Sequence, residues 1–136
     1  MVDLRPLRLA VKARLDTITG LNVLDDASGK IPLDPDGKAH QYAVLYPGGG
    51  YNPLAGEAVC GAPGEFVWRF QVTCAGGDID RAEWALTRVR AAILGTQLTA
   101  VSGLIREDFT PEFAIQDTTA TPLRWYYPAI FTVTLP

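Results

Sequence analysis

Apolar and polar residues alternate over residues 66–74, and this alternation predicts a β-strand with one buried face. The apolar set comprises Phe66, Trp68, Phe70, Val72 and Cys74. The polar set between them comprises Arg69, Gln71 and Thr73. We expect the apolar set to face the core and the polar set to face solvent or a partner molecule. Because glycine tolerates turn conformations, Ala75-Gly76-Gly77 is predicted to end the strand.

A helical spacing follows this turn and predicts an amphipathic helix over residues 79–94. Its apolar stripe advances by three or four residues at a time and comprises Ile79, Ala82, Leu86, Val89 and Ile93. Asp78 or Asp80 is suited to cap the first turn, and Gly95 is suited to end the helix. We expect this stripe to cover the apolar face of the sheet that contains the strand.

A second amphipathic helix is predicted over residues 4–18. Its stripe comprises Leu4, Leu7, Val11, Leu15 and Ile18. Asp3 can cap it, Pro6 falls in the first turn, where proline is tolerated, and Gly20 is expected to close it. Residues 21–24 are a candidate short strand.

Four further stretches have strand character: residues 40–46, 103–109, 114–118 and 129–135. In the last of these, Ala129, Phe131, Val133 and Leu135 share one face. Pro128 has no backbone donor, so we expect it at the start of that strand or at a sheet edge.

These elements predict the fold class. Consecutive strands joined by turns favour an antiparallel sheet. The expected fold is α+β, a two-layer, mainly antiparallel sheet with two helices packed on one face. The 136 residues are expected to form a single domain, residues 1–136, which is long enough to bury a core.

Residues 47–64 are rich in glycine and proline and are expected to form a long hairpin loop between two antiparallel strands. Apolar side chains are unusual in a merely solvated loop and indicate a contact surface. The interface candidates are therefore Tyr51, Leu54 and Val59 of the loop, with Arg69, Gln71 and Thr73 of the strand.

Composition and charge exclude several function classes. The net charge of −3 argues against specific nucleic-acid binding, which needs a basic surface. There is no run of 18 apolar residues, so no membrane span is expected, and the acidic N-terminal residues do not resemble a signal peptide. Cys60 and Cys74 are expected to be reduced thiols, and with one histidine they do not have zinc-site spacing. We expect no metal and no cofactor.

The residues that carry chemistry lack the spacing of an active site. Asp34-x-Asp36-Gly37 resembles the start of a calcium loop, but the later carboxylate ligands are missing, so a plain turn is predicted. His40 has no nucleophile or orienting acid at recognisable spacing and is expected to be a strand-edge residue. Glu107 and Asp108 are adjacent on a predicted strand, where neighbouring side chains point to opposite faces. The sequence therefore predicts no enzymatic activity.

The order of these elements resembles that of the tail terminator, or tail completion, proteins of long-tailed, siphovirus-type bacteriophages. The resemblance covers most of the chain. It lies in the helix of residues 4–18, the strand Tyr42-Ala43-Val44-Leu45-Tyr46, the strand 66–74 with its Gly-Gly-Asp turn and the helix 79–94, the run Ile105-Arg106-Glu107-Asp108 and the closing strand 127–135. The Gly/Pro-rich segment at residues 47–64 departs from the shorter members of the family.

The resemblance implies a structural virion protein without catalytic activity. Such a protein forms a homo-hexameric ring that caps the tail tube subunits, ends tube polymerisation and joins the tail to the head–tail connector or stopper protein. It is assembled in the host cytoplasm and lies at the head–tail junction, where DNA passes through its lumen. The alternatives are another neck or tail component (a connector, a tube subunit or a minor tail protein), a small ligand-binding module and a small enzyme.

Overall fold

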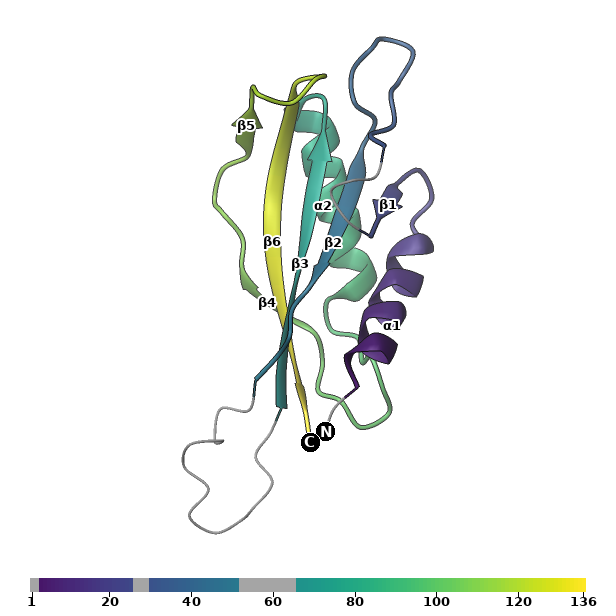
Figure 1. Ribbon diagram of the computed structural model, residues 1–136, viewed down its shortest axis with the longest axis vertical. Coiled ribbons are helices and arrows are strands. Elements are labelled where there is room, and N and C mark those ends of the chain that lie inside the picture. The colour runs from purple at the N-terminus through teal and green to yellow at the C-terminus, as the bar shows by residue number, and fades with distance from the viewer. Residues whose placement is uncertain (1–2, 26–29, 52–65) are drawn as a thin grey trace.

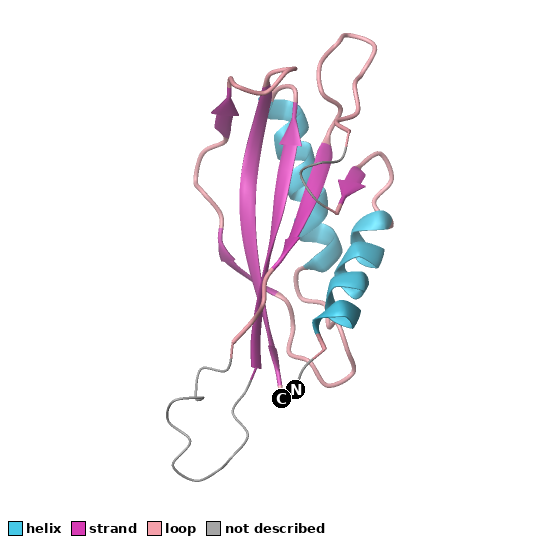
Figure 2. Ribbon diagram, viewed as in Figure 1, coloured by secondary structure: helices cyan, strands magenta, loops and turns pink. Residues whose placement is uncertain are grey.

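The computed structural model describes residues 3–25, 30–51 and 66–136. Within these residues the chain forms a six-stranded sheet and two helices (Figure 1; Figure 2). The elements are α1 (Leu4–Asp16), β1 (Asn22–Leu24), β2 (Tyr42–Pro47), β3 (Phe66–Gly76), α2 (Ile79–Ile93), β4 (Arg106–Phe109), β5 (Ile115–Asp117) and β6 (Arg124–Leu135). The fold class is α+β, as the sequence predicts.

The strand order in the sheet is β1–β2–β3–β6–β4, and β5 lies beside β4 on the same edge of β6 (Figure 1). The neighbouring pairs are antiparallel except β1 with β2, which is parallel. The longest pair, β3 with β6, runs from Phe66 opposite Leu135 to Gly76 opposite Trp125. These two long strands form the centre of the sheet.

Both helices pack on one face of the sheet, as predicted, and a single cluster of buried side chains joins them to β2, β3 and β6. Trp68, Phe70 and Phe131 are among its largest fully buried members. Phe70 and Phe131 are cross-strand partners with ring centroids 5.5 Å apart. Burying each phenylalanine side chain stabilises the fold by about 1.5–3 kcal/mol. The Trp68 indole N–H donates to the carbonyl oxygen of Gly48 at 2.8 Å, so its polar atom is also satisfied.

Helix α1 forms where its stripe predicts but ends earlier. The Asp3 carboxylate accepts a backbone N–H of the first turn at 3.1 Å and caps the helix. Its buried residues are Leu7, Val11 and Leu15. The prediction that the helix reaches residue 18 is wrong, because the Thr17 hydroxyl bonds a carbonyl of the last turn at 2.6 Å and the chain leaves the helix after Asp16. Ile18 still packs against the core from the following turn.

Helix α2 is capped by Asp78 and not by Asp80, since the Asp78 carboxylate accepts the backbone N–H of Arg81 at 2.9 Å. The buried residues of α2 are Ala82, Ala85, Leu86, Val89 and Ile93. The predicted burial of Ile79 is wrong: this side chain is 41% exposed, because it occupies the first helical position on the flank of the stripe. Gly95 follows the helix with a left-handed φ of 73°, in agreement with the predicted end.

Strand β3 continues through two residues that the sequence pattern assigns to a turn. Ala75 and Gly76 are still paired with β6, so the prediction that they break the strand is wrong. The chain turns at Gly77, whose N–H donates to the carbonyl of Ala39 at 2.9 Å. A Cβ on Gly77 would lie 2.7 Å from the nitrogen of Ala39, closer than real contacts allow. Glycine is required here for close approach of two chain segments.

Pro128 lies in the middle of β6, so its predicted position at a strand start or sheet edge is wrong. It is paired with Thr73 of β3. On the other side of β6, the pairing with β5 ends at Tyr126 and the pairing with β4 begins at Ile130. Pro128 therefore lies opposite the gap between β4 and β5. A proline is tolerated inside a strand where no partner strand requires its missing N–H.

Candidate interaction surface

The face of the sheet opposite the helices carries the polar set of β3. In the ladder, Gln71 lies between Tyr46 of β2 and Ile130 of β6. Arg69 is exposed and Gln71 is half-buried, whereas Thr73 is only 6% exposed. These three candidates share one face, as expected, but only the region around Arg69 and Gln71 is accessible in the isolated chain.

Arg69 connects three segments on this face. Its Nε lies 3.3 Å from a carboxylate oxygen of Asp108 on β4, and its guanidinium carbon lies 5.5 Å from the ring centroid of Tyr51. The backbones of Tyr51 and Val67 exchange hydrogen bonds at 2.7 and 2.8 Å, which continues the β2–β3 hairpin beyond the end of β2. Exposed contacts of these kinds contribute about 1 kcal/mol or less each, so they orient Arg69 and leave it available for a partner.

A shallow hollow of about 340 Å³ lies beside Arg69. It is lined from β2, β3 and β6 by residues that include Tyr46, Gln71 and Ile130. Aromatic, amide and aliphatic side chains thus meet at one open depression. Such a mixed surface is suited to contact with another protein, because it offers both apolar area and hydrogen-bonding groups.

The opposite end of the same face is covered by the chain itself. A second buried cluster contains Ala39, Tyr42, Val44 and Ala75. The Tyr42 hydroxyl accepts a hydrogen bond from Arg124 at 2.9 Å, which ties β2 to β6 across this end. The residues before β2 therefore cover part of the sheet face that the sequence pattern predicts to be open. The accessible part of this face extends along Arg69 and Gln71 but does not reach Thr73.

A strip of exposed apolar side chains follows the β4–β5 edge. Its members are Phe109, Phe113, Ile115 and Leu123. Phe113 is 75% exposed and Phe109 is 61% exposed. We call these four residues the edge strip. The sequence pattern does not reveal the strip as a unit, because Phe109 and Ile115 fall in predicted strands. The large apolar residues Phe113 and Leu123 lie between strands, and this placement is a signal of a contact surface.

Ion pairs hold this edge in place. Arg90 of α2 binds both carboxylate oxygens of Glu107 on β4, at 2.7 and 2.8 Å. Arg124 binds Asp117 of β5 at 3.1 Å. The Arg90 side chain holds the pKa of Glu107 below its usual value by hydrogen bonding to the charged form. Short edge strands are thus fixed by side chains as well as by the ladder.

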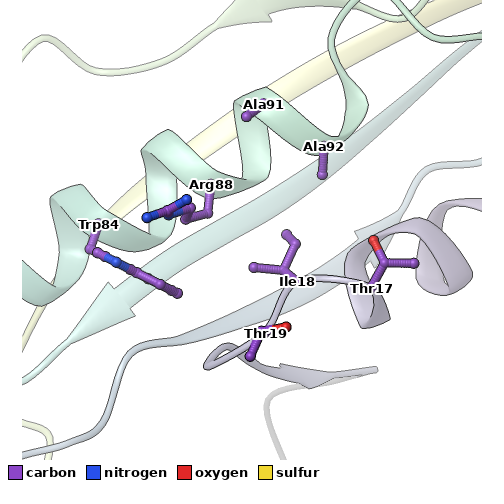
Figure 3. Close-up of a pocket in the computed structure, with 7 residues that line it drawn as sticks. All are labelled: Thr17, Ile18, Thr19, Trp84, Arg88, Ala91 and Ala92. Carbon is purple, nitrogen blue, oxygen red and sulfur yellow. The ribbon is translucent and has the colours of Figure 1, made fainter.

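A groove on the helical side separates the end of α1 from α2 (Figure 3). Its volume is about 460 Å³. Residues 17–19 form one wall, and Trp84, Arg88, Ala91 and Ala92 form the other. The Arg88 guanidinium carbon lies 5.2 Å from the Trp84 ring centroid. The groove therefore combines an aromatic surface, small apolar side chains and one positive charge.

The carboxylates of the acidic motif at residues 34–37 bind an arginine side chain. Arg81 of α2 binds Asp34 through Nε at 2.9 Å, Asp36 through Nη2 at 2.9 Å and Asp78 through Nη1. The segment is a plain turn, as predicted, and the Gly37 N–H donates to the carbonyl of Asp34 at 2.9 Å. A backbone hydrogen bond and the Arg81 side chain hold the pKa of Asp36 below its usual value. These carboxylates fasten the turn to α2.

His40 lies beside this cluster, and its side chain contacts the carboxylate of Asp34. Its Nδ1 lies 2.8 Å from the Asp34 carboxylate, and its Nε2 lies 2.8 Å from the carbonyl oxygen of Gly20. Asp34 is not at a recognisable spacing from His40, and the turn brings it back to the histidine, which lies just before β2. Both ring nitrogens are engaged, and the side chain links the turn to the loop after α1.

Glu107 and Asp108 point to opposite faces of the sheet, as predicted. Glu107 contacts Arg90 on the helical side, and Asp108 contacts Arg69 on the other side. The two carboxylates are thus held apart in separate ion pairs. This arrangement is that of a structural edge strand and does not assemble a carboxylate pair for acid–base catalysis.

The described residues also bear on the expectations about membrane spans, metal sites and cysteines. In residues 3–25, 30–51 and 66–136, no helix is long and apolar enough to cross a membrane. The same residues contain no group of three or more His, Cys, Asp or Glu side chains that could hold a metal ion. Cys74 is a free, buried thiol. Leu54, Val59 and Cys60 lie outside the described residues.

A scan against protein-family models finds no match to this chain, and a search of curated proteins finds no similar sequence. The features of the chain that bear on its function are the open sheet face, the edge strip and the groove between the helices.

Proposed function

We propose that this chain is the tail terminator of a long-tailed bacteriophage, a structural protein that caps the tail tube as a ring of six copies. In this role it ends tube polymerisation and joins the tail to the head connector or stopper protein at the head–tail junction. Its neighbours are copies of itself, the tube subunit and the connector. No chemical step is part of this function.

The one-sided covering of the sheet carries this proposal. Both helices lie on one face, while the region around Arg69 and Gln71 on the other face remains accessible. The edge strip adds large apolar side chains along one rim. A chain with an open face and an apolar rim is suited to repeated contact with identical copies, and repeated contacts that close produce a ring.

Helix content and charge favour a terminator over the alternatives. Helix accounts for 24% of the described residues, more than we expect of a tube subunit built mainly from a β-sandwich. The net charge of −3 suits a ring through which DNA passes, because an acidic protein does not retain phosphate. The catalytic alternative receives little support, since Glu107, Asp108 and His40 are each engaged in structural contacts.

The test combines the purified chain with its cognate tail-tube subunit. We expect native mass spectrometry to give a closed ring of six copies, and electron microscopy to show that tubes stop growing when the chain is added. Gln71→Arg on the open face should weaken capping, whereas Ala13→Arg, at an exposed position on α1, should leave it unchanged. A chain that remains monomeric and neither binds tubes nor limits their length would refute the proposal.

A further inference from the structure

Phe113 is the most exposed large apolar side chain in the described part of the protein. It lies between β4 and β5, it is 75% exposed, and the neighbouring Glu112 is exposed as well. An aromatic side chain that is mostly presented to water loses most of the stabilisation that burial would supply. The negative charge of Glu112 beside the exposed ring also favours a partner surface that carries a positive charge. The segment has the composition of an interface anchor.

The groove between α1 and α2 is complementary to this anchor. Ala91 and Ala92 leave space, Trp84 supplies an aromatic wall, and Arg88 places a positive charge at that wall (Figure 3). A volume of about 460 Å³ has room for a phenylalanine side chain and part of its backbone. A phenylalanine in the groove would contact Trp84, and an adjacent glutamate would reach toward Arg88.

We infer that Glu112 and Phe113 of one copy dock into the α1–α2 groove of the next copy. This inference rests on the proposed function, because it names the contact that builds the ring. The edge strip and α1 lie on opposite sides of the molecule (Figure 1), so one chain does not fill its own groove. Each copy then offers an anchor on one side and a groove on the other. Such head-to-tail contacts close into a ring when the rotation between copies permits.

Opposite charges on the two surfaces favour a second copy as the occupant. Glu112 belongs to the anchor and Arg88 belongs to the groove, so the contact pairs an acid with a base at every interface of the ring. The contact between two anchors would bring two glutamates together, and the contact between two grooves would bring two arginines together. A contact between an anchor and a groove is the one that pairs opposite charges.

Two charge-reversed variants test this contact. Glu112→Arg sets an arginine against Arg88, and Arg88→Glu sets a glutamate against Glu112. Each variant alone should raise the concentration at which half of the chains assemble by at least about tenfold, because like charges then meet. Mixed in equal amounts, they should form a ring of alternating copies, since every interface again pairs an acid with a base. Arg5→Glu, at the other end of α1, is the matched control and should assemble as wild type does.

Phe113→Ala tests the aromatic anchor separately. We expect it to raise the half-assembly concentration by roughly tenfold or more at any salt concentration, as loss of a central interface aromatic does. Leu33→Ala removes another exposed apolar side chain, on the turn before β2, and should have no effect on assembly. Circular dichroism of each variant checks that the fold is retained.

The outcomes separate this contact from the terminator function. A wild-type ring that all these variants form equally well, or charge-reversed variants that fail to rescue each other, would overturn the docking inference alone. A ring that depends on Phe113 and Arg88 but does not stop tube growth would refute the terminator proposal and leave the docking contact standing. A wild-type chain that stays monomeric would overturn both.

Discussion

Replacing Phe131 by alanine should remove a large share of the stability of this fold. Phe131 lies on β6 with none of its surface exposed, at the centre of the helix-facing side of the sheet. It is paired with Phe70 on β3, with ring centroids 5.5 Å apart, and with Glu107 on β4. The truncation therefore leaves a cavity between three strands and removes a stacked aromatic pair.

The expected cost follows from this environment. Phenylalanine-to-alanine changes in closely packed cores cost about 3–5 kcal/mol, which combines lost burial with the cavity that remains. Neighbouring strands on both sides of Phe131 are fixed by backbone pairing, so we expect little collapse and a value in the upper half of this range. The total stability of a domain is only about 5–15 kcal/mol. The variant should thus remain folded with a much smaller margin.

Urea denaturation followed by tryptophan fluorescence measures the effect. With a cost of about 4–5 kcal/mol and a urea dependence of about 1–3 kcal/mol per molar, the midpoint should fall by roughly 1.3–5 M. Phe109→Ala is the matched control, because it makes the same change on the neighbouring strand at a side chain that is 61% exposed. It should cost less than about 1 kcal/mol. Equal midpoints for the two variants, or a loss below about 1 kcal/mol for Phe131→Ala, would refute this account of the core.

Three other predictions follow from individual contacts. Glu107→Gln should destabilise the fold above pH 4.5, the usual pKa of glutamate, by about 1 kcal/mol or less. Because hydrogen bonding to Arg90 lowers the pKa of Glu107 in the folded state, the difference from wild type in urea titrations should disappear as the pH falls below 4.5 and through this lowered pKa. A difference that stays constant with pH would contradict this prediction. Burial raises the pKa of the Cys74 thiol, so in a variant whose other cysteine is serine, a thiol reagent should react only after urea unfolding; rapid reaction of the native chain would show an accessible thiol. Gly48→Ala should destabilise the fold, because its Cβ would strike a backbone carbonyl oxygen of β3, whereas Gly49→Ala has open space; similar thermal midpoints would refute this.

Much of the secondary structure could be predicted because local periodicity reports burial directly. The alternation in β3 and the stripe of α2 both mark residues that reach the same core. The cap at Asp3 could be predicted because capping depends on side chains within a few residues of a helix start. Element ends were less predictable, since the end of α1 at Asp16 depends on a competing local hydrogen bond.

The features that could not be predicted depend on contacts between distant segments. Pro128 is tolerated inside β6 only because β4 and β5 leave a gap opposite it. Gly76 remains in β3 because β6 extends far enough to pair with it. Asp34 reaches His40 because a turn reverses the chain, and no spacing rule specifies that partner.

The candidate surface shows the same division. The sequence places Arg69, Gln71 and Thr73 on one face, since period-two alternation requires it. In the folded chain, Thr73 is buried beside the second cluster, at the covered end of this face, whereas Arg69 and Gln71 remain accessible. The edge strip and the α1–α2 groove arise where separate elements meet, so only the folded chain reveals them.

The sequence by itself determined most of the side chains that turn inward in α1, α2, β3 and β6, because the local period marks one face of each element. It also determined the α+β class, because two helical stripes and several alternating strands have few ways to cover one another. Tertiary structure alone decided which polar groups meet and which apolar side chains remain exposed at the rim. Those outcomes depend on strand order and register, which join residues far apart along the chain.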